Sequence, residues 1–310
     1  MKLKHLALIA ALIFSLFLAA CGGSDDAAET DTQQNGDETT EQASKETSED
    51  AAEESANLVA GAPLQDGTYT LKETEADKNG WKVEMTITVE DGKIVESNFD
   101  YVNDEGLLKS EDEEYQQLMK DKSGIGPAEF VPALNEALVE TQNPMDVEVV
   151  TGATGSWQTF RNYAQQLVQA AQKGDTTTIE INPNAPLQDG EYSLKELNPD
   201  AHGWSFFMNM TVAGGQITEV EWDYVNPEGT LKSEDEAYQE RMAEKVNIGP
   251  KEFVPALAQD LIEKQNAKEV EVVAGATHST YSFKTYAAQL INAAQKGDTT
   301  PIEVDNLVFE

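Results

Sequence analysis

The chain has 310 residues, enough for about two domains of ordinary size, and its apolar content of 39% permits ordinary cores. Its 57 acidic residues outnumber its 21 basic residues and give a formal net charge of −36, which repels polyanions and predicts that nucleic acid is not a partner. With one cysteine and three histidines, the chain can form no intrachain disulfide and lacks the Cys/His clusters of zinc, iron–sulfur and c-type haem sites, so any electron carrier here has to be organic.

Residues 1–20 are predicted to be a secretory signal peptide. Lys2 and Lys4 form a positive start, and the apolar run that ends at Leu18 is too short for an ordinary membrane span. The sequence Leu18-Ala19-Ala20-Cys21 resembles the lipobox of bacterial lipoproteins, in which the cysteine becomes the mature N-terminus and carries the lipid. The resemblance implies lipidation of Cys21 and anchoring in the cell membrane on its extracytoplasmic face. The alternative is an ordinary signal peptide that happens to contain a cysteine.

Residues 21–60 are expected to be the lipidated cysteine and a disordered acidic tether. This stretch has almost no large apolar side chain, and the segment from Asp25 to Glu54 has twelve acids against one lysine, Lys45. Such a composition cannot bury enough surface to fold, and its like charges extend it.

The sequence repeats itself from Ala62 onward. The segment Ala62–Gly67 returns as Ala185–Gly190, an offset of 123 residues, and Asp100–Asn103 returns as Asp223–Asn226 at the same offset. A period this long predicts two tandem domains, residues 61–182 and 183–310, rather than a solenoid.

Each copy is predicted to be α+β, an antiparallel sheet with helices packed on it. In the first copy, alternating apolar residues predict strands at 67–73, 81–89 and 93–102, with Asp91-Gly92 as a hairpin turn. Helices are expected from about 110 to 120, from 127 to 139 and from 156 to 172, and a fourth strand at 147–150.

One short stretch occurs in both copies at the start of the last predicted helix. Glu148–Ser156 reads Glu-Val-Val-Thr-Gly-Ala-Thr-Gly-Ser, and Glu271–Ser279 reads Glu-Val-Val-Ala-Gly-Ala-Thr-His-Ser. The glycine can adopt the positive φ that a tight strand-to-helix turn often requires. The threonine after it, Thr154 or Thr277, then places its hydroxyl where free backbone N–H groups collect, a place that suits a phosphate.

These residues resemble the Ser/Thr-Gly-Ala-Thr-x-Ser/Thr signature of FMN-binding domains. In that family the last threonine carries FMN through a phosphoester, which a separate flavin transferase installs with FAD as donor. The resemblance therefore implies two covalent FMN groups per chain, on Thr154 and Thr277. The other residues that it assigns to cofactor binding are Thr151, Gly152, Ala153, Ser156, Gly275, Ala276 and Ser279.

The match departs from the family pattern at three positions. Glu148 and Glu271 stand where the family usually has aspartate, and Ala274 replaces the first Ser/Thr of the signature. We therefore expect Thr154 to be modified more completely than Thr277. The alternative role for either threonine is a helix N-cap.

An isoalloxazine ring needs a flat apolar wall, and Trp81 and Trp204 are predicted to supply it. The pairs Tyr101/Tyr224 and Met85/Met208 also repeat, although repeated residues of these types more often belong to a core. Two interpretations are open for the turns Gly124–Pro127 and Asn247–Pro250: they bring the backbone close to a ligand, or they only end and begin helices. Two are also open for His278: it hydrogen-bonds the flavin or its phosphate, or it is an exposed residue without a role.

The whole mature chain is similar to the extracellular electron-transfer flavoproteins of Gram-positive bacteria. This resemblance implies electron transfer from a quinol-oxidising system in the membrane to extracellular acceptors, with no substrate chemistry beyond it. One alternative is a non-redox surface binding module. Another is a precursor whose product is the fragment Ile13–Ala19, which resembles the peptides cut from pheromone-precursor lipoproteins.

Overall fold

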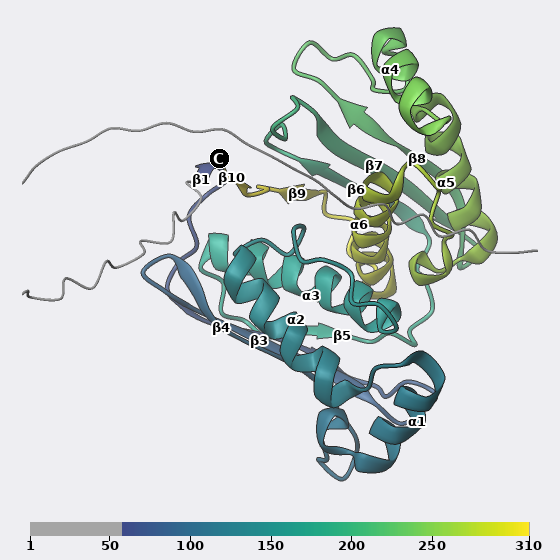
Figure 1. Cartoon of the computed structure of the whole chain (residues 1–310). Helices are drawn as coiled ribbons and strands as arrows, with labels where there is room; N and C mark the ends of the chain where they lie inside the picture. Colours follow the sequence, from purple (N-terminus) through teal and green to yellow (C-terminus); the bar gives the residue numbers. More distant parts are fainter. Residues whose placement is uncertain (1–57, 310) are drawn as a thin grey trace, which may run out of the picture. The chain divides into compact units, whose positions relative to one another are not determined.

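A computed structural model describes residues 58–309 (Figure 1). The predicted signal peptide, Cys21 and most of the acidic tether lie outside these residues. The described residues belong to one compact unit, Glu54–Glu310, which contains both copies of the repeat. We refer to residues 61–182 as the first half and to residues 183–309 as the second half.

The first half contains a four-stranded sheet in the order β4-β3-β2-β5. Its strands are β2 (Gly67–Glu73), β3 (Lys82–Glu90), β4 (Lys93–Val102) and β5 (Ile179–Ile181). The three predicted strands are confirmed, and β2, β3 and β4 pair antiparallel through the predicted hairpin turn. Asp91 and Gly92 have φ angles of 51° and 73°, the left-handed conformation that two-residue hairpin turns require.

The strand predicted at residues 147–150 is wrong. Its place at the edge of the sheet is taken by β5, which pairs parallel with β2, so the sheet is mixed rather than antiparallel. The carbonyl groups of residues 147–150 are used locally instead. The Val147 carbonyl accepts a hydrogen bond from Trp157 Nε1 at 2.9 Å, and the Val150 carbonyl accepts one from the Ala153 N–H at 3.0 Å.

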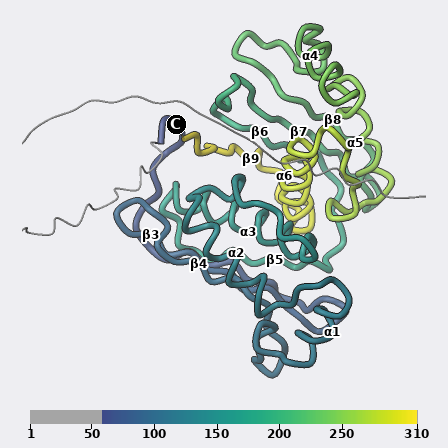
Figure 2. The backbone as a smooth tube through the Cα atoms, viewed as in Figure 1, coloured from purple at the N-terminus to yellow at the C-terminus, as the bar shows by residue number. Residues whose placement is uncertain are grey.

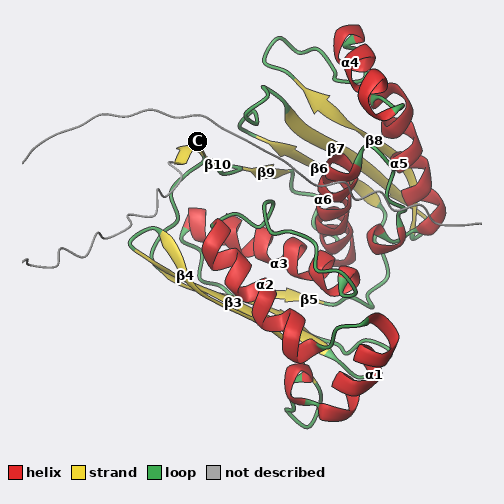
Figure 3. Ribbon diagram, in the orientation of Figure 1, coloured by secondary structure: helices red, strands yellow, loops and turns green. Residues whose placement is uncertain are grey.

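The helices lie on one face of this sheet (Figure 3). They are η1 (Lys109–Glu111), α1 (Glu113–Ser123), α2 (Pro127–Thr141) and α3 (Thr154–Lys173). The helix α1 begins after Asp112, whose side chain accepts the Tyr115 N–H at 2.8 Å, and it ends at Gly124 with a φ of 82°. The helix α2 packs on β4, and α3 packs on β2 and β3.

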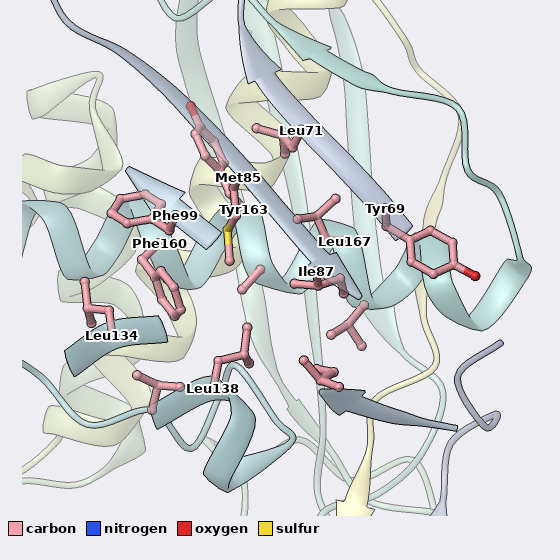
Figure 4. Close-up of a cluster of buried hydrophobic side chains, with 14 of the residues drawn as sticks. Tyr69, Leu71, Met85, Ile87, Phe99, Leu134, Leu138, Phe160, Tyr163 and Leu167 are labelled. Atoms are coloured by element: carbon pink, nitrogen blue, oxygen red, sulfur yellow. The ribbon is translucent and has the colours of Figure 1, made fainter. Parts of the chain in front are cut away.

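The core of the first half lies between this sheet and the two long helices (Figure 4). Met85 and Ile87 point inward from β3, because alternate residues of a strand share one face. Leu134 from α2 and Phe160 from α3 meet them and are completely buried. The rings of Phe99 and Phe160 pack edge to face with centroids 5.2 Å apart.

The second half has the same order of strands and α-helices, with the sheet β8-β7-β6-β9. Its elements are β6 (Gly190–Glu196), β7 (Ser205–Ala213), β8 (Gln216–Val225), α4 (Glu236–Val246), α5 (Pro250–Lys264), η2 (Ala267–Glu269), α6 (Thr277–Lys296) and β9 (Ile302–Val304). Two short strands at the ends of the described chain, β1 (Leu58–Ala60) and β10 (Val308–Phe309), pair antiparallel with each other.

The helices α3 and α6 form the contact between the halves (Figure 2). The side-chain amides of Gln169 and Gln289 bond to each other in both directions, at 3.2 and 2.8 Å, and both residues are buried. Asn162 Nδ2 also donates to Asn292 Oδ1 at 2.9 Å. These buried amides of the contact therefore satisfy one another. The rings of Trp157 and Tyr281 also pack edge to face across it, with centroids 4.6 Å apart.

We expect Gln289→Leu to lower the free energy of unfolding by about 1–3 kcal/mol, because the buried amide of Gln169 would lose its partner. The double variant Gln169→Leu/Gln289→Leu should be within about 1 kcal/mol of the unmodified protein, since it buries no unpaired amide. Urea denaturation of the singles and the double measures this. Additive losses in the double variant would contradict the paired-amide interpretation.

Candidate functional site

The two threonines of the repeated motif are the first residues of the two longest helices. Thr154 begins α3 and Thr277 begins α6, and both side chains are exposed. The N-cap residues are Ala153 and Ala276, and neither helix has a side-chain cap. Neither threonine is therefore a helix N-cap, and both hydroxyls lie beside the positive end of a helix dipole.

The glycine of the motif is required by the turn that leads into each helix. Gly152 and Gly275 have φ angles of 84° and 86°, in the left-handed region. A Cβ at Gly152 would come within 2.5 Å of the Ser123 carbonyl oxygen. This turn places the motif against the end of α1. The next residues, Ala153 and Ala276, are buried under the turn.

A polar cluster lies along the first turns of α3. Tyr163 Oη donates to Glu73 Oε1 at 2.6 Å, and Glu73 Oε2 accepts the Val83 N–H at 2.8 Å. Tyr101 lies near Ser156 and Thr159, and burial raises the pKa of its phenol well above the usual range.

The second half repeats this cluster with the same residue types. Tyr286 Oη donates to Glu196 Oε1 at 2.5 Å, and burial raises the pKa of Glu196. Tyr224 lies near Ser279 and Ser282, although its buried hydroxyl has no hydrogen-bond partner among the described residues. Sequence reasoning missed the two tyrosine–glutamate pairs, although all four residues keep the offset of 123.

A buried lysine lies beside each cluster, surrounded by aromatic rings. Lys109 Nζ is 5.1 Å from the Trp81 ring centroid, 3.7 Å from that of Tyr101 and 4.8 Å from that of Tyr115. In the second half, Lys232 lies in the same way over its own three rings. These rings belong to Trp204, Tyr224 and Tyr238. Trp81 and Trp204 thus each contact a lysine through cation–π interactions.

Burial lowers the pKa of Lys109 to about 8, against the raising effect of the nearby Asp77. In the unfolded chain the pKa of Lys109 has its usual value of 10.5. Between about pH 8 and pH 10.5 the unfolded state therefore binds more protons than the folded state. The contribution of Lys109 to stability therefore rises with pH over this window.

We expect the unmodified protein to gain about 2 kcal/mol of unfolding free energy relative to Lys109→Met between pH 7 and pH 10. Urea denaturation at a series of pH values measures the difference. The variant Lys232→Met should show the same sign, because burial also lowers the pKa of Lys232. A difference that stays constant with pH would contradict the buried position of Lys109.

Two cavities have lining residues within one helical turn of the two threonines, although neither threonine is itself in a lining. Cavity A has a volume of about 470 Å³ and starts one helical turn after Thr154, at Gln158 and Thr159. Cavity B has a volume of about 320 Å³ and includes His278, the residue after Thr277. Pockets of about 300–1,000 Å³ are typical of small-molecule and cofactor sites.

The residues around these cavities fit an FMN group. An exposed threonine at a helix N-terminus suits the phosphate, and the adjacent cavity provides room for a ring system. Cavity B also has two buried polar atoms, Tyr224 Oη and Gln165 Oε1, that no described residue satisfies. Unpaired buried polar atoms in a cavity indicate a place for a polar ligand.

The other predicted residues lie elsewhere or have a structural role. Trp81 and Trp204 are among the lining residues of neither cavity, so their predicted role as a flavin wall stays a prediction. Met85 and Met208 are completely buried in the two cores. Gly126 and Gly249 cap α2 and α5, which makes these turns helix punctuation.

Within residues 58–309, His, Cys, Asp and Glu side chains form no group of three that could hold a metal ion. The helices of the same range are also too short or too polar to cross a membrane.

The family model of the FMN-binding domain matches residues 79–169, which include the first copy of the motif. Two solved structures are similar over about one copy of the repeat. A crystal structure of the CPE2226 protein from Clostridium perfringens is 39% identical, covers 38% of this chain and 98% of its own, and has a TM-score of 0.37. A solution NMR structure from Clostridium thermocellum is 26% identical, covers 35% of this chain and 92% of its own, and has a TM-score of 0.24.

A curated relative is similar over the same length. The 15 kDa lipoprotein of Treponema pallidum (strain Nichols) is 41% identical over 116 residues, which are 37% of this chain and 82% of the relative. The chain therefore belongs to the family of lipoproteins that contain an FMN-binding domain.

Proposed function

We propose that the protein is a membrane-anchored electron carrier with two FMN groups, one esterified to Thr154 and one to Thr277. The observation that carries the proposal is the geometry of these threonines. Each is exposed, each starts a long helix without capping it, and each is followed within one helical turn by a residue that lines a cavity. The hydroxyl is thus available for an ester, and the helix N-terminus suits the phosphate.

FMN, when bound, would supply the reversible uptake of electrons. The residues of the chain would provide the attachment point of the FMN and the environment of its ring. A threonine hydroxyl is a poor nucleophile at neutral pH and needs a base or metal for activation. The motif offers neither a histidine–acid pair nor a metal cluster, which favours attachment by a separate flavin transferase.

The second half is proposed to be a second FMN-binding domain. It repeats the strand order, the Gly-Ala-Thr turn and the tyrosine–glutamate pair of the half that the family model matches. A covalent flavin stays with the protein, whereas a dissociable flavin outside a cell would be diluted. The proposed donor is a quinol-oxidising system in the membrane, and the proposed acceptors are extracellular.

The intact mass of the purified, denatured protein tests this function. After co-expression with a flavin transferase, we expect two FMN additions that survive denaturation. A protein without covalent flavin, in the presence of an active transferase, would favour the non-redox surface binding module. Synthetic peptides of residues 13–19, applied to recipient cells, test the pheromone alternative separately.

We expect Cys21→Ser to release the protein from membranes or to leave it unprocessed, because the lipid is proposed to be attached to that sulfur. Membrane fractionation with mass analysis of the N-terminus measures this. Recovery of a mature, membrane-bound form of the variant would overturn the proposed anchor.

A further inference from the structure

Each cavity is lined in part by a loop from the opposite half. Cavity A includes residues of α3 from the first half, and it also includes residues of α6 and of loop 266–270, which contains η2, from the second half. Cavity B lies beside α6 of the second half but includes residues of loop 143–147 from the first half. Positions that differ by 123 residues line both cavities: Glu73 and Glu196, Thr159 and Ser282, and Asn266 and Asn143.

The two loops are held in place in the same way. Arg161 on α3 is buried, and its Nη2 donates to the Met145 carbonyl at 2.9 Å. Lys284 occupies the equivalent position on α6, is also buried, and donates to the Lys268 carbonyl at 3.2 Å. The backbone carbonyl of Met145 and that of Lys268 therefore each accept a hydrogen bond from a buried cation, and the two side chains differ.

Lys268 brings a positive charge to cavity A. It is one of the lining residues of this cavity, where desolvation lowers its pKa and the charges of Glu73 and Asp77 oppose that lowering. Its charge also acts on Lys109 of the first half, whose pKa it lowers. Lys268 thus lies beside the polar cluster of the half to which it does not belong.

The lining residues of cavity B have the opposite charge balance, although the charge of Arg161, the equivalent of Lys284, acts on His278 of this lining. Met145 packs against the core of the second half, and Asp146 follows it in the lining. Three carboxylates but neither lysine nor arginine are among the described residues of this lining, whereas cavity A has two lysines and one carboxylate. In a chain with a net charge of −36, a cavity with an excess of lysine is a local exception.

We infer that Lys268 gives the flavin on Thr154 a higher midpoint potential than the flavin on Thr277. The inference rests on the proposed function. A flavin that takes up two electrons and one proton gains one negative charge, and a nearby ammonium stabilises that charge. Met145, at the equivalent place in cavity B, offers no such stabilisation, and Asp146 opposes it.

The test uses full-length protein that carries one flavin at a time. Thr277→Val leaves the flavin on Thr154, and Thr154→Val leaves the flavin on Thr277. Spectroelectrochemical titration with dithionite as reductant gives each midpoint potential. We expect the Thr154 flavin to have the higher value, and Lys268→Met to lower it by about 30 mV, a tenfold change for a two-electron couple. Met145→Lys should raise the potential of the Thr277 flavin by a similar amount.

The decisive comparison is which flavin responds to Lys268→Met. Lys268 belongs to the half that carries Thr277, yet the inference assigns its effect to the flavin on Thr154. A shift confined to the Thr277 flavin, or no shift at all, overturns the inference. Lys264→Met is the matched control, because Lys264 is exposed, lies close in sequence and is outside both linings.

A second measurement does not depend on flavin. In full-length protein without FMN, NMR titration of Lys268 should show a lower pKa in Glu73→Gln than in the unmodified chain, because the charge of Glu73 raises it. An unchanged pKa would overturn the placement of Lys268 in cavity A. Failure to attach any flavin would overturn the proposed function and the potential difference together, and this titration would still decide where Lys268 lies.

Discussion

Replacing Thr154 with valine should remove one of the two covalent FMN groups, replacing Thr277 should remove the other, and the double variant should carry none. Valine keeps nearly the shape of threonine but has no oxygen to esterify. Because neither threonine caps its helix, stability should change by less than about 0.5 kcal/mol. Intact mass after denaturation counts the flavins, and thermal melting confirms the fold.

Each single variant is the control for the other. We expect Thr154 to be the more completely modified residue, because Thr151 keeps the hydroxyl that Ala274 lacks. If the transferase prefers aspartate before the motif, Glu148→Asp should raise the occupancy of Thr154. Two full FMN additions on the double variant would place the flavins on other residues and remove the main support for the proposed function.

Separating the halves should lower stability without preventing folding. The fragment 61–182 keeps its own sheet and nearly all of its core, so we expect it to melt cooperatively. It loses the amide partners on α6 and the contact of its core with Leu307. If the free energy of unfolding falls by a few kcal/mol, the melting temperature of a domain of this size falls by roughly 10 °C.

Adding the fragment 183–310 should restore part of the lost stability, because the buried amides of α3 and α6 could pair again. Calorimetry of each fragment and of their mixture measures both effects. Aggregation of the fragment 61–182 at all temperatures would contradict separate folding, and an unchanged melting temperature would contradict the contact between α3 and α6.

Local sequence patterns predicted most elements of the first half. The alternation in residues 67–73 and 93–102, the Asp91-Gly92 turn and the Gly-Ala-Thr turn each act within a few residues, and the structure confirms them. The same patterns predicted Thr154 at the start of a helix, and α3 begins there.

The features that the sequence did not predict depend on distant contacts. Residues 147–150 have an apolar pattern like a strand, but their carbonyl groups are used by Trp157 and by the turn, while β5 pairs with β2 across more than 100 residues. The burial of Lys109 requires rings from β4, from α1 and from the residue before β3. The exchange of loops depends on how the two halves pack, which no local pattern contains.

The exchange of loops also limits how many copies of this domain can be combined. Each half gives one loop and receives one, as in the isologous interface of a twofold dimer, so two copies satisfy each other completely. A protein with one copy could complete its cavity in this way only by forming a homodimer. In a protein with three copies, one copy would have no second copy with which to exchange loops. This arrangement therefore favours even copy numbers.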